Sequence, residues 1–241
     1  MLSCSKKGFI AESDTAERRV DLMPVPPLVQ EIESGMRKRY GETNLDGDLS
    51  FIASLQKFIF GLVNRPANEQ ETLHEAARFI FHSFGFKEIT ISLRSQTDGK
   101  YHYETFLGMT REAEKSYRSL AYDHDVVFDD NTYPGVKLSK FTELMLAELK
   151  PYDQGEETTF NRPMMNKAQR KSADEMIDFD YYAVYLYGPG EQIFGWLELS
   201  STRDGKFPSM KTIRQLELFS MVLSLILGQW RWPPKKATGH T

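Results

Sequence analysis

Residues 193–227 read IFGWLELSSTRDGKFPSMKTIRQLELFSMVLSLIL, and this stretch decides the fold class. Residues 193–201 show the alternation of period two that is typical of a β-strand. A polar turn follows, and from Ser209 the apolar residues recur at helical spacing as far as Trp230. The stretch therefore predicts a strand that leads through a turn into one long helix.

The second half of that helix contains an almost entirely apolar run at residues 221–227. A membrane-spanning helix needs roughly 18–20 such residues, so we expect neither a membrane anchor nor a membrane partner. A helix that lies on a sheet buries only one face. The second apolar face of this run must therefore meet another helix or another subunit.

Two helices and a hairpin precede this stretch. The spacing of apolar residues predicts amphipathic helices over residues 50–63 and 67–84. The period then changes, because residues 87–95 and 101–108 alternate on either side of a turn that contains Gly99. Two alternating segments around a short turn predict an antiparallel hairpin.

The middle of the chain, residues 109–178, shows no strong strand pattern and predicts loops and short helices. Within it, the segment LSKFTELMLAEL at residues 138–149 carries an apolar stripe. Alternation returns at residues 179–188, where both sets of alternating residues are apolar or aromatic. Such a strand is typically central and covered on both faces, and with the strand at 193–201 it completes a second hairpin.

The predicted order is helix, helix, hairpin, irregular segment, hairpin and long helix. This order resembles a GAF domain, in which a strand of the form x-Gly-x-Leu-x-Leu is followed by a polar turn, a Phe and an amphipathic helix. The residues at those positions are Gly195, Leu197, Leu199, Phe207, Leu216, Phe219 and Leu223. The resemblance covers roughly residues 50–231.

The resemblance implies an α+β fold. An antiparallel sheet of about six strands would lie between a layer of N- and C-terminal helices and a layer of loops and short helices. Residues 1–48 would form an N-terminal tail and a peripheral helix at 27–40, residues 49–232 the GAF-like domain, and residues 233–241 a disordered C-terminal tail. In sensory GAF domains the pocket lies between the sheet and the loop layer.

Composition narrows the classes of partner. The formal net charge of −4 and the pI of about 5.8 lack the basic character of a duplex-binding surface, so we expect no nucleic-acid partner. The single cysteine, Cys4, excludes an intramolecular disulfide and favours a reducing cytoplasm. Without a thiol in the predicted core, the resemblance implies neither a methionine sulfoxide reductase nor a covalently bound bilin.

A ligand pocket would be lined by aromatic and polar residues of the strands and of the neighbouring loops. Strand aromatics also serve as ordinary packing, and this alternative stays open. The candidate pocket residues are Tyr103, Thr105, Tyr122, His124, Phe128, Arg162, Tyr182, Trp196 and Glu198.

The sequence gives only weak signals for metal binding, cyclic-nucleotide binding or catalysis. The segment DHDVVFDD at 123–130 has oxygen and imidazole groups, but its spacing matches no metal motif, so a solvated acidic loop is favoured. Asn166-Lys167 and Asp174-Glu175 resemble part of a cyclic-nucleotide motif whose Phe is missing between them. We predict no metal, no cofactor and no catalytic residue, with an enzyme that uses 123–130 as the weakest alternative.

The terminal helices predict a partner surface. GAF domains commonly dimerise through these helices, which implies a homodimer; burial against the chain's own N-terminal helices is the alternative. The candidate interface residues are Phe51, Leu55, Phe58, Leu62, Leu218, Val222 and Leu225.

Two functions are consistent with these features. The first is a non-enzymatic, cytoplasmic sensory or regulatory domain that binds a small molecule and signals by helix-mediated contact with another protein. The second is a GAF-fold interaction or dimerisation module whose pocket is filled by its own aromatic residues and which binds no metabolite.

Overall fold

The computed structural model describes residues 47–64, 68–149 and 170–232. The predicted helix at 27–40 and the predicted tail at 233–241 lie outside the described residues.

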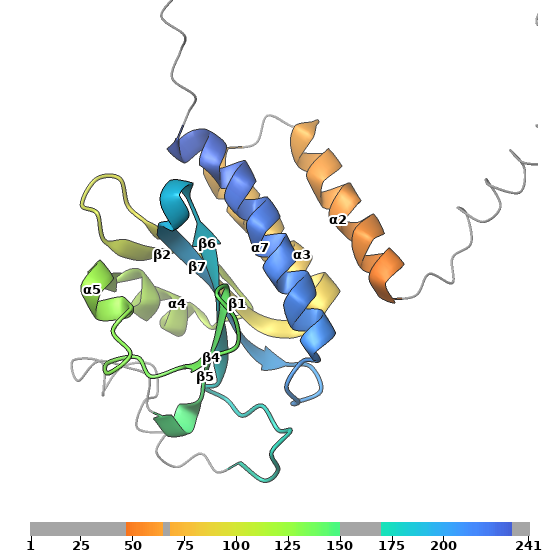
Figure 1. Ribbon diagram of the computed structural model, residues 1–241, viewed down its shortest axis with the longest axis vertical. Coiled ribbons are helices and arrows are strands. Elements are labelled where there is room, and N and C mark those ends of the chain that lie inside the picture. The colour runs from red at the N-terminus through yellow and green to blue at the C-terminus, as the bar shows by residue number, and fades with distance from the viewer. Residues whose placement is uncertain (1–46, 65–67, 150–169, 233–241) are drawn as a thin grey trace, which may run out of the picture. The chain divides into compact units, whose positions relative to one another are not determined.

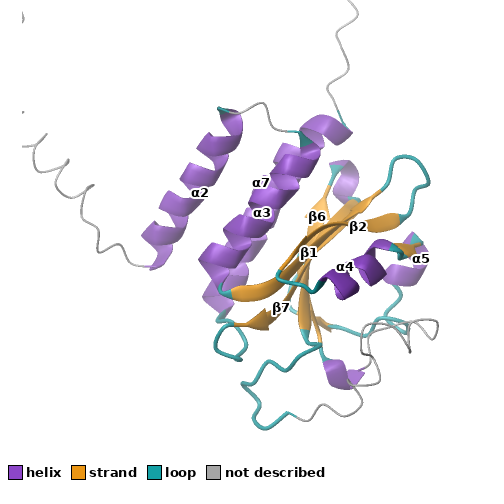
Figure 2. Ribbon diagram, turned by 180° about the vertical axis from the view of Figure 1, so that it is seen from behind, coloured by secondary structure: helices purple, strands orange, loops and turns teal. Residues whose placement is uncertain are grey.

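A seven-stranded sheet forms the centre of the described domain, in the order β3-β2-β1-β7-β6-β5-β4. Figure 2 shows strands of this sheet as orange arrows. All neighbouring strands are antiparallel. The strands are β1 (Phe86–Arg94), β2 (Tyr101–Leu107), β3 (Ala121–Tyr122), β4 (Val136–Lys137), β5 (Thr142–Met145), β6 (Tyr181–Tyr187) and β7 (Ile193–Thr202). The predicted α+β fold with an antiparallel sheet is confirmed.

Helices cover both faces of this sheet (Figure 1). On one face lie α3 (Glu69–Phe84) and α7 (Met210–Arg231), with α2 (Gly47–Val63) packed outside them. On the other face lie the short helices α4 (Arg111–Arg118) and α5 (His124–Val127). Two 3-10 turns, Ala147–Leu149 and Pro189–Glu191, complete the described elements. This is the predicted arrangement of a helical layer, a sheet and a layer of loops and short helices.

Local chemistry explains where the long helices begin and end. The side chain of Asn68 accepts a hydrogen bond from the backbone N–H of Glu71, whose carboxylate accepts from the Asn68 N–H, so a capping box opens α3. Gly85 closes this helix with a left-handed φ of 78°. Ser209 caps α7 by accepting from the N–H of Thr212.

The main core lies between the sheet and the helical layer. Ile89, Ile91 and Leu93 of β1 point toward the helices, as do Leu197 and Leu199 of β7. Strand β6 is buried on both faces along most of its length, which confirms the prediction of a central strand. The opposite face of the sheet is thereby left to the aromatic and polar residues of the same strands.

The middle of the chain differs from the sequence prediction. It contains three short strands, β3, β4 and β5, where only loops and short helices were predicted. Strand β5 lies inside the apolar stripe of residues 138–149 and pairs with β6, from Thr142 opposite Val184 to Met145 opposite Tyr181. Pairing with a buried neighbouring strand, a tertiary effect, decided this conformation.

Candidate functional site

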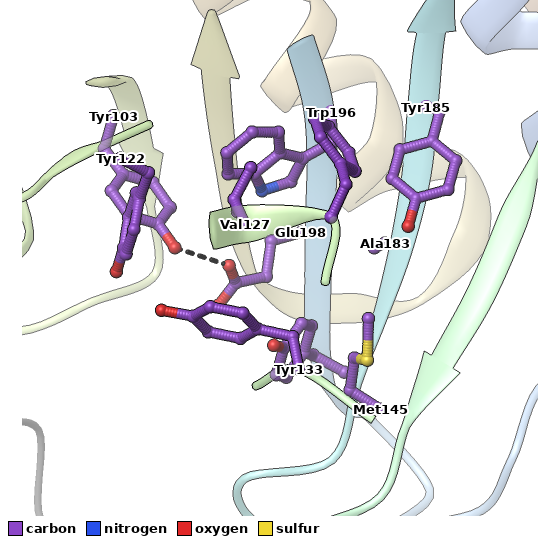
Figure 3. A pocket seen from close by; sticks show the side chains of 11 residues that line it. Tyr103, Tyr122, Val127, Tyr133, Met145, Ala183, Tyr185, Trp196 and Glu198 are labelled. Atoms are coloured by element: carbon purple, nitrogen blue, oxygen red, sulfur yellow. Dashed lines mark hydrogen bonds between the residues drawn. The ribbon is translucent and has the colours of Figure 1, made fainter. Parts of the chain in front are cut away.

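An aromatic pocket lies between the sheet and the α5 layer (Figure 3). Its volume is about 40 Å³. The side chains that line it are Tyr103, Tyr122, Val127, Phe128, Tyr133, Met145, Tyr181, Ala183, Tyr185, Trp196 and Glu198. They come from strands β2, β3, β5, β6 and β7 and from the segment around α5. The pocket therefore joins segments from most of the domain.

Ring contacts hold these walls together. The ring of Phe128 packs against Tyr185, with ring centroids 5.7 Å apart, and against Trp196, with centroids 6.1 Å apart. Tyr103 packs edge-on against Tyr117 of α4, with centroids 4.7 Å apart. Edge-to-face pairs of this kind stabilise and orient aromatic rings, so the walls are well defined.

Glu198 is the acidic group of the aromatic pocket. Its carboxylate accepts a hydrogen bond of 2.8 Å from the hydroxyl of Tyr103 (Figure 3). Burial, and next the negative charge of Glu198, raise the pKa of Tyr103 well above its ordinary value. The Tyr103 hydroxyl therefore keeps its proton and donates to Glu198 at neutral pH.

A second, polar chamber adjoins the aromatic pocket and shares Tyr181 and Glu198 with it. Its volume is about 300 Å³. The residues that line this polar chamber are Glu88, Thr90, Met109, Thr110, Ala113, Tyr117, Asp178, Phe179, Asp180, Tyr181, Glu198, Ser200 and Ser201. Strands β1 and β7 form its floor, and α4 and the segment before β6 form its walls.

The floor of the polar chamber carries hydroxyls beside carboxylates. Ser200 and Ser201 donate to one oxygen of Glu88 over 3.2 and 3.4 Å. The Thr90 hydroxyl is buried and has no hydrogen-bond partner among the described residues. Phe179 and Ser201 also line the chamber, and both have a left-handed φ, of 83° and 54°. Strained backbone of this kind clusters at binding sites, so its presence here favours the chamber as a ligand site.

Asp180, although it lines the same chamber, has a structural role. Its carboxylate pairs with the guanidinium of Arg170 at 3.0 Å and accepts hydrogen bonds from the backbone N–H groups of Ala147 and Ile177. Arg170 also binds Glu148 through two nitrogens, and the bonds to Glu148 and Asp180 raise the pKa of the guanidinium. The Asp180 charge is therefore already neutralised by the fold.

The structure brings most of the predicted pocket residues together. Tyr103, Tyr122, Phe128, Trp196 and Glu198 all line the aromatic pocket. The predicted residue Arg162 lies outside the described residues.

Thr105 and Tyr182 lie on the opposite, helix-covered face of the sheet. The pairing of β2 with β1 passes from Thr105 opposite Ile91 to Tyr103 opposite Ser92, so a bulge turns Thr105 away from the pocket. Its hydroxyl lies 3.5 Å from the side-chain nitrogen of Gln70 on α3. Tyr182 belongs to the core beneath the helices. The structure therefore does not bring these two residues into the pocket.

The acidic segment at 123–130 pairs with lysines and caps its own turns. Asp123 and Asp130 form ion pairs with Lys100 and Lys137 at 3.0 and 2.8 Å. His124 is exposed, and its Nδ1 lies 3.1 Å from the Tyr101 hydroxyl, outside the aromatic pocket. Within the described parts of the chain, no group of three or more His, Cys, Asp and Glu side chains could hold a metal ion.

Several residues that line the two cavities were not among the pocket residues predicted from the sequence. Tyr133, Met145 and Tyr181 line the aromatic pocket, and Glu88 and Thr90 line the polar chamber. A signal for the last two was present, because they belong to the polar set of the alternating segment 87–95. No signal of this kind exists for Tyr133, which lies in a loop.

The candidate interface residues divide into two groups. Phe51 is buried against Phe79 and Phe84, while Leu55 and Phe58 pack on the core. Leu62 and Val222 are half-buried, and Leu218 and Leu225 are exposed. The exposed group lies on the outer side of α7, where Met221 joins it to form a stripe of apolar side chains.

Within the described residues, no helix combines the length and the apolar character that crossing a membrane requires.

Several solved structures with a similar fold are GAF domains. One belongs to a phosphoenolpyruvate-protein phosphotransferase from Acinetobacter, with 11% identity, a TM-score of 0.50, and coverage of 77% of this chain and 96% of that one. Another belongs to the corresponding protein from Coxiella burnetii, with 11% identity, a TM-score of 0.51 and coverage of 76% and 95%.

A third is the nlh2 GAF domain of A. aeolicus in an inactive state, with 10% identity, a TM-score of 0.50 and coverage of 77% and 99%. No family model and no curated protein matches the chain. The structural likeness shows that the described part of the chain has the fold of a GAF domain.

Proposed function

We propose that this chain with a GAF fold is a cytoplasmic, non-enzymatic sensory or regulatory domain. It binds a small molecule on the sheet face that α4 and α5 cover, and it signals through its terminal helices by contact with another protein. The observation that carries the proposal is the polar chamber of about 300 Å³ beside the aromatic pocket. Small-molecule sites typically have volumes of roughly 300–1,000 Å³, so the chamber reaches the lower end of that range.

The aromatic pocket serves as a wall of this site. A cavity needs about 10–15 Å³ to hold one water. The aromatic pocket, at about 40 Å³, therefore accommodates only a few waters. Its side chains already fill most of the space between the sheet and α5. A ligand in the adjoining chamber would contact this wall through the shared residues Tyr181 and Glu198.

The chemistry of the chamber favours binding over catalysis. The polar side chains among its lining residues are carboxylates, aliphatic hydroxyls and phenols. The hydroxyls of Ser200 and Ser201 each donate a hydrogen bond to the Glu88 carboxylate. No histidine or lysine among the described lining residues accompanies them as an acid or base of intermediate pKa.

A chain of contacts connects the pocket with α7. The carboxylate of Glu217, buried on the inner side of α7, accepts hydrogen bonds from the hydroxyls of Ser139 and Thr142. Thr142 begins β5, and Met145 at the other end of that strand lines the aromatic pocket. A displacement of β5 on ligand binding would therefore pull on α7, whose outer side carries the exposed apolar stripe.

The second function, an interaction module without a metabolite, is favoured by one observation. The aromatic pocket is nearly filled by its own side chains, as this function requires. In this case the domain would act only through the outer surface of its helices.

Native mass spectrometry of the protein purified from its own host tests the proposal. We expect a retained small molecule on the unaltered chain and none on Ala113→Phe, because a Phe on α4 would occupy the polar chamber. The matched control is Ala121→Phe on strand β3, because Ala121 is exposed and lines neither cavity.

A thermal-shift screen with metabolite mixtures complements this experiment. A ligand at a hundred times its dissociation constant stabilises the native state by about 2.7 kcal/mol, and Ala113→Phe should abolish that shift. A chain that carries no small molecule and responds to none of the mixtures would favour the interaction module instead.

A further inference from the structure

Residues 174–180, which we call the strap, connect the polar chamber with the segment that leads into α7. At the beginning of the strap, the Phe207 N–H donates to the carbonyl of Asp174 over 3.0 Å. The Met176 N–H donates to the carbonyl of Gly205 over 2.8 Å. At its other end, the last three residues of the strap line the polar chamber. The strap is therefore a continuous physical connection between the proposed ligand site and the start of α7.

Arg170 binds the strap near both of its ends. The two terminal nitrogens of its guanidinium donate to the two carboxylate oxygens of Asp180, each over 3.0 Å. The guanidinium also donates to the carbonyl of Glu175. Its central carbon lies over the ring of Phe207, 5.1 Å from the ring centroid. Because a planar guanidinium fixes direction as well as distance, a displacement of Asp180 also changes the contact with Phe207.

The strap contains a strained residue beside this ion pair. Phe179 has a φ of 83°, a left-handed conformation that is unfavourable for a residue with a bulky side chain. The adjoining turn is held by the Asp180 carboxylate, which accepts from the N–H of Ile177 at 2.9 Å and from that of Ala147 at 3.0 Å. Strain of this kind persists only where the surroundings enforce it. The bonds of Asp180 therefore hold Phe179 in its strained conformation.

We propose that the strap is a conformational switch that couples occupation of the polar chamber to the start of α7. An occupant that displaces Phe179 weakens the Arg170–Asp180 pair, and Phe207 then loses the guanidinium that covers it. The first turn of α7 becomes looser, whereas the last turn, where Arg231 has an ion pair of its own, stays fixed. This inference rests on the proposed function, because it names how occupation of that same site is signalled.

Residue-resolved hydrogen exchange of the full chain tests the switch without a ligand. Arg170→Gln removes the guanidinium and keeps a polar side chain. We expect exchange to be faster by about tenfold at the Ile177 amide and also at the Thr212 and Ile213 amides in the first turn of α7. The hydrogen bonds of Arg170 go to other groups, so a response of the two α7 amides reports coupling through the strap.

Arg231→Gln is the matched control for this variant. The side chain of Arg231 is 10% exposed, against 16% for that of Arg170, and it pairs with a carboxylate at the opposite end of α7. Arg231→Gln should speed exchange of the Trp232 N–H, which lies at that end of the helix. It should leave the first turn of α7 unchanged.

Phe179→Asn acts in the opposite direction and keeps the test decisive if Arg170→Gln does not fold. Asparagine adopts the left-handed conformation more readily than phenylalanine does, so the observed form of the strap should be favoured. Exchange of the Ile177 and Thr212 amides should then be slower by roughly fivefold. If exchange at Thr212 is not slowed, the start of α7 does not depend on the strap and the inference fails.

Ala113→Phe takes the place of an occupant, because the added ring fills the polar chamber. We expect it to speed exchange of the Thr212 and Ile213 amides in the otherwise unaltered chain. In the Arg170→Gln background it should add little, because both changes act on the same element. Ala121→Phe is the control, since it lines neither cavity and should leave both amides unchanged.

The outcomes separate this inference from the proposed function. Additive effects of Ala113→Phe and Arg170→Gln would overturn the inference, as would a first turn of α7 that responds equally to Arg231→Gln or not at all to Arg170→Gln. In each of these cases, a small molecule retained by the unaltered chain would leave the proposed function standing. The converse result, a first turn that responds in a chain that binds no small molecule, would remove the proposed ligand and keep the mechanical coupling.

Discussion

At the scale of single residues, the close approach of strands β1 and β7 requires a glycine at position 195. A Cβ at this position would lie 2.3 Å from the backbone oxygen of Ser92 and 2.7 Å from a methyl carbon of Leu93. The distance to the Ser92 oxygen requires movement of the pair β1 and β7, because that atom belongs to the backbone. The glycine that marks the strand motif in the sequence therefore serves packing rather than chemistry.

Gly195→Ala should lower the free energy of unfolding by about 1–3 kcal/mol, the usual cost of overpacking a core. Urea unfolding followed by circular dichroism measures this change. Gly61→Ala is the control, because no atom lies within 4 Å of the added Cβ and alanine is favoured inside a helix such as α2. Equal midpoints for the two variants would show that the approach of β7 to β1 does not constrain this position.

The buried phenols predict a loss of stability in alkali. Burial raises the pKa of both Tyr103 and Tyr185 above the ordinary value of about 10. In the unfolded chain these groups ionise first, so their contribution is complete below pH of about 10 and is lost as the pH rises toward the folded pKa. The free energy of unfolding of the unaltered chain should therefore fall above pH of about 10.

Tyr103→Phe removes one of these groups, so its stability should decline less steeply between pH of about 10 and 11. Urea midpoints measured across that interval give the two slopes. At neutral pH the variant loses its hydrogen bond to Glu198, and this offset is separate from the slope. Identical slopes would mean that Tyr103 ionises as readily in the folded as in the unfolded chain.

At the scale of elements, the capping box of α3 connects sequence to stability. Asn68→Ala should cost about 1 kcal/mol, because the N–H of Glu71 loses the acceptor at 2.8 Å and α3 packs on the sheet. Thr110→Ala removes the same kind of cap from α4, which has no buried residue, so its effect on the unfolding midpoint should be smaller. A larger effect for Thr110→Ala would mean that α4 contributes more to global stability than its exposure indicates.

The elements that the sequence predicts well are those with long, strong periodicity. Helices α2, α3 and α7 and the strands of both hairpins follow from apolar spacing, because each is long enough for its apolar residues to establish a period. Strand β5 could not be predicted from apolar spacing, because its four residues, 142–145, are too few to establish a period. Its conformation follows from pairing with β6. The bulge that turns Thr105 toward α3 could not be predicted either, because a bulge is a property of a pair of strands.

At the scale of the whole molecule, the candidate site depends on contacts between distant segments. Tyr103 and Glu198 were predicted from strand patterns, yet their hydrogen bond joins residues almost a hundred positions apart in the chain. The sequence named residues for one pocket, and the structure contains two adjoining cavities whose border is Glu198 and Tyr181. The arrangement of the strands decides which residues line the nearly filled aromatic pocket and which line the polar chamber, so the two cavities could not be distinguished from the sequence.

The outer side of α7 carries exposed apolar side chains. Leu225 is 76% exposed, and Leu218 and Met221 are each 47% exposed. Their spacing places them on one side of the helix, opposite the residues that pack on the sheet. An apolar stripe of this kind on a terminal helix supports the proposed homodimer, because its burial against a second copy would remove it from water.

Light scattering of the full chain at micromolar concentration should therefore give the mass of a dimer, and Leu225→Lys should give that of a monomer, since a lysine would carry a charge into the contact. Val126→Lys is the matched control, because Val126 is an exposed apolar residue on α5, across the sheet from α7. It should leave the dimer intact. A chain that is monomeric at this concentration, also after deletion of residues 1–45, would contradict dimerisation through α7 and leave the stripe for a different protein.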